Sequence, residues 1–280
     1  MANPIPGHYD LAAVDMDGTL LNTDHAISDA SRAVIARAAA AGKLVALSTG
    51  RCLTEVEDHL AACPGIAYVT GENGGYLYDV RQKRMLRQLF LPDEAAETIL
   101  ERAGAIDVGI QCFFDERSHI QMADDAALAH YHVAEFASVF HQCSVYVPDM
   151  LAVLRAGRRA EKINLYFPDD ASARAFRPVL DALPVRVAGS VGVGYEISPE
   201  GASKAEGLRA LCEITGVPIE RTMAVGDGGN DLDLMAAAGL SVAMGNAIDE
   251  VRALAGATTE DCDHDGCARA LRRWLLGENV

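Results

Sequence analysis

The chain has 280 residues, half of them apolar, and a formal net charge of −16. This length and apolar content allow a sizeable core, in one large domain or in two smaller ones. A surface this acidic repels nucleic-acid backbones and anionic lipids, so we expect neither as a partner. A small phosphorylated substrate is compatible with the charge, because a bound cation and a lysine can reverse the field within one pocket.

The cysteines and the distribution of apolar residues favour a cytoplasmic protein. The seven cysteines are scattered, odd in number and without a CxxC pair, which is typical of reduced thiols. Residues 1–9 lack the basic and apolar regions of a signal peptide. No stretch has the apolar length that a membrane-spanning helix needs.

The first predicted strand, residues 11–14, runs directly into Asp15-Met16-Asp17-Gly18-Thr19. An apolar run that ends in this way predicts a buried strand at the carboxyl edge of a parallel sheet. One carboxylate could attack phosphorus, the other could carry a proton, and both could help to hold a divalent cation. Taken alone, the pattern is equally compatible with a strand that ends in an ordinary turn. A calcium-binding loop is excluded, because its sixth and twelfth positions would be Leu20 and Ala26.

A helix over residues 28–41, with Ser28 as its N-cap, and a strand over residues 44–48 follow. Strand, helix and strand at this spacing predict a βαβ unit and therefore a parallel sheet. The second strand ends in Thr49-Gly50-Arg51, where a hydroxyl and a backbone amide could bind a phosphoryl oxygen. Without Asp15 at the same edge, a simple turn would be the preferred interpretation. Further elements expected in this half are a helix over residues 53–63, a strand over 68–70 and a hairpin of strands 76–78 and 85–90.

From Leu91-Pro92-Asp93 to about Ser190 the pattern mixes helices and strands without strict alternation, which predicts an α+β unit. We expect a second domain over residues 85–190, inserted into a catalytic core of residues 1–84 and 191–280, and closing over the site as a lid. The expected helices are 93–103, 123–136 and 170–182, and the expected strands are 108–114, 144–147, 163–167 and a hairpin of 185–189 with 195–198. Candidate substrate contacts in the insert are His119, Gln121, Arg158, Lys162 and Tyr166, although solvated surface is the preferred interpretation for most of them.

Lys204 lies at the start of a helix predicted to run to about residue 215. The helix dipole does not favour a cation in the first turn, so this placement suggests that the lysine holds an anion. An isolated lysine of this kind would more often be solvated surface. A third apolar strand, residues 223–225, ends in Gly226-Asp227-Gly228-Gly229-Asn230-Asp231, whose oxygens are hard ligands for a cation. The alternative is an acidic helix N-terminus in which aspartate satisfies free amides.

The remaining residues predict a helix over 232–238, a strand over 240–244 and a last helix over 266–276. Cys262, His264 and Cys267 match no established metal-ligand spacing, so we do not expect them to form a metal site.

Four segments, taken in order, resemble the haloacid dehalogenase superfamily and specifically its Cof-type phosphatases. They are residues 15–19, 48–51, 203–204 and 226–231, with further similarity at residues 73–74, 243–247 and 265–266. Each motif is weak alone, but the four together are highly specific, and the resemblance covers the chain outside about residues 85–190. It implies an α/β fold with a Rossmann-like parallel-sheet core and an inserted α/β (α+β) cap domain.

The resemblance also implies a role for each matching residue. Asp15 would be the nucleophile, and Asp17 the acid that protonates the leaving oxygen and later activates water. Mg²⁺ would be held by the side chains of Asp15 and Asp227 and by the backbone carbonyl of Asp17. The phosphoryl group would be bound by Met16 (through its amide), Thr49, Gly50, Lys204 and Asn230, and Arg51 and Asp231 are further candidates for the site.

Together these inferences predict a Mg²⁺-dependent phosphomonoester hydrolase that forms an aspartyl-phosphate intermediate. Its substrate would be a small phosphorylated metabolite, either a sugar phosphate or a phosphorylated cofactor, and the protein would be a monomer or a small homo-oligomer. The charges support this prediction, because a carboxylate attacking a phosphate dianion is repelled unless a cation and Lys204 neutralise both. The alternatives are a phosphomutase or phosphotransferase on the same core and a non-catalytic binding protein.

Overall fold

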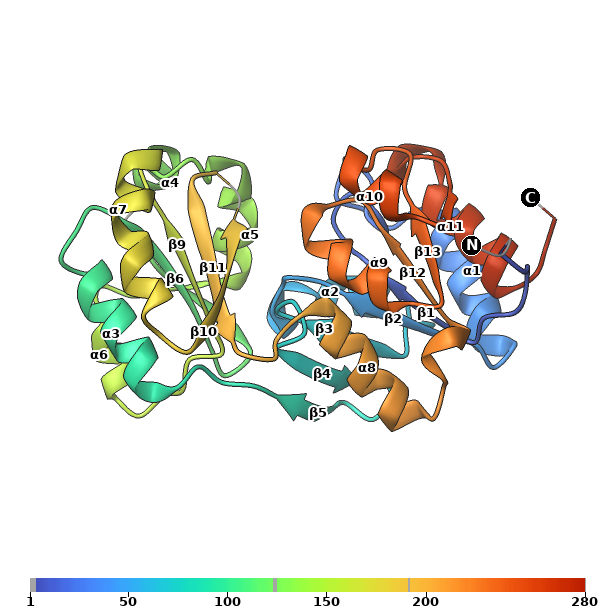
Figure 1. The fold of residues 1–280 in the computed structure, drawn as a ribbon, viewed down its shortest axis with the longest axis horizontal. Helices are drawn as coiled ribbons and strands as arrows, with labels where there is room; N and C mark the ends of the chain where they lie inside the picture. The colour runs from blue at the N-terminus through green and yellow to red at the C-terminus, as the bar shows by residue number, and fades with distance from the viewer. Residues whose placement is uncertain (1–3, 123–124, 191, 280) are drawn as a thin grey trace. The chain divides into compact units, whose positions relative to one another are not determined.

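The computed structural model describes residues 4–122, 125–190 and 192–279. The chain divides into two compact α/β units (Figure 1). The core unit comprises Met1–Arg51, Glu57–Arg87 and Ser203–Val280, and the insert unit comprises Cys52–Val56 and Gln88–Ala202. Within the described residues, no helix is both long and apolar enough to cross a membrane.

The core unit is built on a sheet with the strand order β14-β13-β12-β1-β2-β3-β4-β5. The strands are β1 (Leu11–Val14), β2 (Leu44–Ser48), β3 (Tyr68–Gly71), β4 (Tyr76–Asp79), β5 (Arg84–Gln88), β12 (Thr222–Gly226), β13 (Leu240–Ala243) and β14 (Ala257–Thr258). β1 pairs in parallel with both β2 and β12, which places Leu11 beside Leu44 and Thr222. All four residues of β1 are buried, as expected for a parallel strand covered on both faces. The predicted parallel βαβ unit is confirmed, and β1, β2 and β12 end at the same edge of the sheet.

Short helices cover the two faces of this sheet. They are α1 (Asp29–Ala40), α2 (Glu57–Ala62), α8 (Lys204–Thr215), α9 (Leu232–Ala237), α10 (Asp249–Leu254) and α11 (Gly266–Ala270). Ser28 caps α1 as predicted, since its side chain accepts a hydrogen bond from the amide of Ser31. The last helix was predicted as one regular helix, but it widens into a π-helical segment at Leu271–Leu275.

The insert unit is built on a mainly antiparallel sheet with the strand order β10-β11-β9-β6-β7-β8. The strands are β6 (Gly109–Phe114), β7 (Arg117–Gln121), β8 (Val145–Tyr146), β9 (Lys162–Tyr166), β10 (Val185–Ser190) and β11 (Gly194–Pro199). The helices are α3 (Asp93–Ala103), α4 (Asp125–His130), α5 (Ala137–Cys143), α6 (Met150–Arg155) and α7 (Asp170–Asp181). Successive residues of a strand face opposite sides, so Leu165 packs with side chains of α3, α6 and α7, and Tyr166 packs with side chains of α4 and α5.

The insert unit differs from the sequence expectation at its boundaries and in several short elements. We expected it to end near residue 190, but it continues to Ala202, because β11 pairs with both β10 and β9. The hairpin of β10 and β11 was itself predicted and is confirmed. The elements β7, α5 and α6 were not predicted. The expected helix over residues 123–136 is replaced by α4 and a 3₁₀ turn at Ala134–Phe136, and residues 123–124 lie outside the described residues.

Asp10, immediately before β1, joins three segments at the amino-terminal edge of the core sheet. Its carboxylate pairs with Lys43 at 2.9 Å and with Arg221, and its amide donates to the Arg221 carbonyl at 2.8 Å. The hydrogen bond from Arg221 lowers the pKa of Asp10 from 3.8 to about 2, and Lys43 adds to this effect.

We expect Asp10→Asn to lower the free energy of unfolding at neutral pH by about 1 kcal/mol, since partial solvent exposure weakens ion pairs of this kind. The folded-state pKa lies below the unfolded value, so the ionised carboxylate stabilises the fold above pH 3.8 and loses this contribution as the pH falls toward 2. Urea denaturation of the wild type and the variant at pH 7 and at pH 3 measures the difference. An equal difference in unfolding free energy at both pH values would contradict the link between the lowered pKa of Asp10 and stability.

Candidate active site

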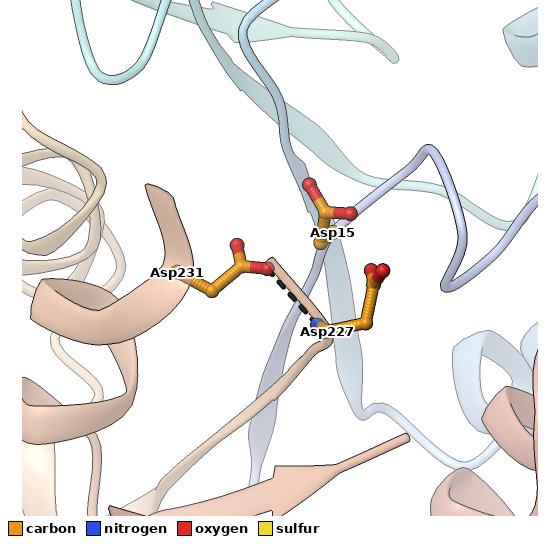
Figure 2. A group of neighbouring side chains, drawn as sticks. All are labelled: Asp15, Asp227 and Asp231. Atoms are coloured by element: carbon orange, nitrogen blue, oxygen red, sulfur yellow. Dashed lines mark hydrogen bonds between the residues drawn. The ribbon is translucent and has the colours of Figure 1, made fainter. Parts of the chain in front are cut away.

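Three aspartates meet at the carboxyl edge of the core sheet (Figure 2). Asp15 follows β1, Asp227 follows β12, and Asp231 ends the 3₁₀ turn Gly229–Asp231. The parallel pairing extends to Asp15, whose amide donates to the Val225 carbonyl at 2.9 Å. One carboxylate oxygen from each aspartate lies within 4.8 Å of the other two. The structure therefore brings together Asp15 and Asp227, the two side chains expected to bind a cation, and adds Asp231 to them.

Burial and mutual repulsion dominate the electrostatics of this aspartate cluster. Asp15 is only 6% exposed, and burial, followed by the nearby charge of Asp231, raises its pKa well above the usual value. Burial also raises the pKa of Asp227 to about 6, although the hydrogen bond from Thr19 opposes this shift. A cation would relieve the repulsion between these groups, and carboxylate oxygens are the ligands that suit Mg²⁺. The residues present therefore fit a divalent cation.

The side chain of Lys204 is fully buried between two of these carboxylates. Its Nζ donates to Asp15 Oδ1 at 2.5 Å and to Asp231 Oδ1 at 2.6 Å. Burial acts to lower the pKa of Lys204, but the attraction of Asp15 and Asp231 outweighs burial and raises it above the usual value. The lysine therefore carries its charge in the site, and it holds anionic groups as its position in the first turn of α8 suggested.

The start of α8 is fixed so that Lys204 reaches the edge of the sheet. Ser203 is the N-cap of α8, and its Oγ accepts a hydrogen bond from the Glu206 amide at 3.1 Å. A Cβ atom on Gly74 would lie 2.0 Å from the Ser203 carbonyl oxygen, and Gly74 has a φ of +88°. Only glycine allows this close approach. The glycine between β3 and β4 thus lets the helix that carries the lysine pack against the loop.

Asp231 organises the loop that follows β12. Its side chain is fully buried, and its Oδ2 accepts a hydrogen bond from the Asp227 amide at 3.0 Å (Figure 2). The same oxygen accepts a second hydrogen bond, from the Gly228 amide at 3.0 Å. A Cβ atom on Gly226 would lie 2.6 Å from the Asp231 carboxyl carbon, so glycine is needed there. Asp231 therefore satisfies free amides, as one interpretation of the sequence held, and also contacts Lys204 inside the site.

The carboxylate of Asp17 points to a different partner from that of Asp15. Asp17 Oδ2 accepts a hydrogen bond from Arg51 Nε at 2.9 Å, and its Oδ1 accepts one from Arg51 Nη2 at 2.5 Å. The Asp17 side chain is 51% exposed, whereas that of Asp15 is 8% exposed. The two carboxylates of the first motif thus have different environments, one buried beside a lysine and one at the surface in a two-bond pair with arginine.

The remaining predicted phosphate-binding residues occupy the ends of the same strands. Thr49 follows β2, and its Oγ1 accepts a hydrogen bond from the Arg51 amide at 3.2 Å. Met16 is fully buried, and the contact of its amide with a phosphoryl group stays a prediction from the resemblance. Gly50 lies between Thr49 and Arg51, and Asn230 is exposed in the turn after β12.

Two neighbours of Asp227 were given no role from the sequence. Thr19 is buried, and its Oγ1 donates to Asp227 Oδ1 at 2.7 Å. Gly18 has a φ of +76°, and a Cβ atom on it would lie 2.6 Å from Asp227 Oδ2. Both residues belong to the first motif, so the signal was present. Their partner could not be identified because it lies 208 residues beyond Thr19 in the chain.

The other candidates from the sequence have structural partners. Within the insert unit, Lys162 forms an ion pair with Glu196 at 2.9 Å, and Arg158 forms one with Asp115. Tyr166 donates a hydrogen bond to Gln111 at 2.7 Å, and Gln121 accepts one from the Met150 amide at 2.6 Å. His119 Nδ1 lies 3.1 Å from the Arg117 carbonyl. In the core unit, His264 Nδ1 lies 2.7 Å from Asp261, and Cys267 is buried. In the described part of the chain, the group with metal-ligand spacing is the aspartate cluster and does not include Cys262, His264 or Cys267.

Comparisons with known proteins cover nearly the whole chain. A sequence profile described as haloacid dehalogenase-like hydrolase matches residues 12–271. The chain is 29% identical over 269 residues to the 5-amino-6-(5-phospho-D-ribitylamino)uracil phosphatase YcsE of Bacillus subtilis, with 95% of this chain and 96% of that protein covered. It is 28% identical over 276 residues to the HMP-PP phosphatase of Serratia proteamaculans, with coverage of 95% and 96%. A solved haloacid dehalogenase-like hydrolase from B. subtilis superimposes with a TM-score of 0.84 at 25% identity, over 94% of this chain and 99% of that one.

Proposed function

Because this chain belongs to the haloacid dehalogenase-like hydrolases and is a Cof-type phosphatase, we propose that it hydrolyses small phosphomonoesters through an aspartyl-phosphate on Asp15. The observation that supports this most strongly is the buried Lys204, 2.5 Å from Asp15 and 2.6 Å from Asp231. A carboxylate beside a lysine and a group of cation-binding acids can attack a phosphoryl group that would otherwise repel it.

The side chains of Asp15 and Asp227 would hold Mg²⁺, with the backbone carbonyl of Asp17 as a further ligand. Their oxygen donors suit this hard cation better than a soft metal that prefers sulfur. When bound, Mg²⁺ supplies positive charge that neutralises and orients the phosphoryl oxygens. Lys204 supplies a second positive charge from the protein itself.

The two carboxylates of the first motif would have different roles in the reaction, Asp15 as the nucleophile and Asp17 as the acid and base. In the first step, an Asp15 oxygen attacks phosphorus, and the bond to the leaving oxygen breaks as Asp17 gives that oxygen a proton. In the second step, Asp17 takes a proton from water, the water oxygen attacks phosphorus, and the bond to Asp15 breaks to release inorganic phosphate. Lys204, Asn230, Thr49 and the amides of Met16 and Gly50 would stabilise the negative charge on the phosphoryl oxygens in both steps.

The ion pair between Asp17 and Arg51 affects how Asp17 can act as the acid. Asp17 must turn away from the guanidinium to reach a leaving oxygen. A phosphoryl group is an alternative anionic partner for arginine, which binds such groups through two parallel hydrogen bonds. We propose that Arg51 exchanges Asp17 for the phosphoryl group when substrate binds, which would free Asp17 to act as the acid.

The substrate would be a small phosphorylated metabolite. One relative is named for a phosphorylated ribitylaminouracil and another for HMP-PP, and we propose either a sugar phosphate or a phosphorylated cofactor for this chain. The insert unit would act as the lid that excludes water and selects the leaving group. The described residues form no disulfide bond, in keeping with a reducing cytoplasm as the setting.

A panel of phosphorylated metabolites tests the proposal directly. Purified protein should release inorganic phosphate from one or more small esters with Mg²⁺, and EDTA should reduce the rate by at least about 10²-fold, because the bound cation stabilises the transition state. Added Mg²⁺ should restore the rate. Phosphate release that EDTA leaves unchanged would contradict the cation site. Transfer of the phosphoryl group to a sugar hydroxyl, without free phosphate, would instead identify a mutase or phosphotransferase.

A further inference from the structure

The side chain of Asn246, in the loop after β13, links three distant segments of the core unit. Its Nδ2 donates to the Gly18 carbonyl at 2.8 Å and to Asp227 Oδ2 at 3.3 Å. Its Oδ1 accepts a hydrogen bond from the Cys262 amide at 3.1 Å. One exposed amide thus connects the turn after β1, the aspartate after β12 and the 3₁₀ turn Cys262–His264.

The partners fix the orientation of this amide. The Cys262 amide is a donor, so it requires the oxygen of Asn246 to face it. The Gly18 carbonyl and the Asp227 carboxylate are acceptors, so they require the nitrogen. The opposite orientation would place like groups against each other at all three contacts. Asn246 therefore presents its donor to Asp227 in one defined geometry.

The backbone around Asn246 is also fixed by hydrogen bonds and by a close contact at Gly245. Gly245 donates to the Glu260 carbonyl at 3.0 Å, and a Cβ atom on Gly245 would lie 2.6 Å from the Asp261 amide nitrogen. On the other side, the Ile248 amide donates to the Asp227 carbonyl at 3.0 Å. The loop is therefore anchored both to the residues around Glu260 and to the residue whose carboxylate Asn246 contacts.

We propose that Asn246 is a positioning residue for the cation site, holding the carboxylate of Asp227 in a binding orientation. Thr19 donates to Oδ1 of Asp227 and Asn246 donates to Oδ2. Each carboxylate oxygen has about two lone-pair sites, so both oxygens can accept these bonds and still ligate a cation. Groups that orient a metal ligand in this way set the affinity of the site, and their loss weakens metal binding by about 10–100-fold.

This inference rests on the proposed cation site, so its test measures cation binding without substrate. Mn²⁺ is titrated into the full-length protein, and free Mn²⁺ is followed by electron paramagnetic resonance for the wild type, Asn246→Ala, Asn246→Ser, Asn22→Ala and Asp227→Asn. Asn22 is the matched control: its Oδ1 accepts hydrogen bonds from the Asp24 and Ala26 amides at 3.1 and 2.9 Å within its own loop.

We expect both Asn246 variants to raise the Mn²⁺ dissociation constant about 10–100-fold, and Asn22→Ala to leave it within about twofold, because its bonds are local. At saturating Mg²⁺, both Asn246 variants should regain most of the wild-type kcat, since the proposed role of Asn246 is to orient a cation ligand. The serine variant keeps a polar side chain, but that side chain is too short for the three hydrogen bonds that Asn246 makes. If Asn246→Ala melts at a lower temperature without cation, the Mn²⁺ dissociation constant of Asn246→Ser decides whether the positioning role stands.

The variants distinguish the hypothesis of a cation site at Asp227 from the hypothesis that Asn246 positions its ligand. If Asp227→Asn weakens Mn²⁺ binding while the Asn246 variants match Asn22→Ala, the positioning role is overturned and the cation site stands. If Asp227→Asn leaves Mn²⁺ binding unchanged, the cation site is overturned, and the role of Asn246 with it.

Discussion

Asp15→Asn should reduce phosphate release by at least about 10³-fold at saturating substrate and Mg²⁺, because a carboxamide cannot replace the attacking carboxylate. The variant should nevertheless be as stable as the wild type or more stable. Burial and the charge of Asp231 raise the pKa of Asp15, so the ionised carboxylate destabilises the fold at neutral pH. Lys204 keeps its bond to Asp231 at 2.6 Å. Initial rates with p-nitrophenyl phosphate and melting temperatures of the same preparations measure both effects.

Asp24→Asn provides the matched control, since Asp24 is exposed in the loop after the first motif. It makes the same chemical change, and its rate should stay within about twofold of the wild type, as for surface substitutions in general. Activity of Asp15→Asn close to that of Asp24→Asn would remove Asp15 as the nucleophile. If the melting temperature of Asp15→Asn falls so far that the variant is unfolded at the assay temperature, the loss of rate would instead assign Asp15 a structural role.

The core could be predicted from local signals because each strand that leads to the site carries its motif at its own carboxyl end. The apolar residues of β1 end at Asp15, those of β2 end before Thr49, and those of β12 end before Asp227. Parallel strands separated by helices place such ends at one edge. Lys204 could be predicted for a different reason, because its position at the start of α8 opposes the helix dipole and therefore needs an anionic partner.

The pairing of side chains could not be predicted, because it depends on distances that the chain order does not encode. Asp17 was expected to supply its carboxylate as the acid, and that carboxylate bonds Arg51, 34 residues away in the sequence. Asn246 was noted only as part of a motif, and its contact with Gly18 spans 228 residues. Several acids and amides are available at this edge. Their choice of partner follows from backbone positions fixed by close contacts such as those at Gly18 and Gly226.

The insert was predicted less well, because its elements are short and pair across long loops. β8 has two residues, and α4 and α6 have six each, which is too few for a clear period. The end of the insert was misplaced because β11 continues the sheet beyond residue 190.

Lys204→Met should reduce phosphate release by about 10²–10³-fold, the usual effect of removing a group that stabilises transition-state charge. Unlike Asp15→Asn, it should also destabilise the protein, because it leaves two buried carboxylates without their cation. Breaking a buried pair in this way costs about 3–5 kcal/mol. Kinetic assays and urea denaturation of the variant measure the two effects. Lys43→Met is the matched control, since Lys43 pairs with Asp10 at the opposite end of β1, and its activity should stay within about twofold.

The double variant Asp15→Asn/Lys204→Met distinguishes the charge from the packing of Lys204. If the lysine stabilises the fold by neutralising Asp15, removal of the Asp15 charge should restore part of the stability that Lys204→Met loses, and the two substitutions should be strongly non-additive. Restoration should be incomplete, because Asp231 still loses its bond from Lys204 and keeps the hydrogen bonds from the amides of Asp227 and Gly228. Phosphate release should stay at least about 10³-fold below that of the wild type, since both the nucleophile and its positive neighbour are missing. Additive losses of stability would show that Lys204 and Asp15 act independently, and would contradict the charge-neutralised nucleophile on which the proposed function depends.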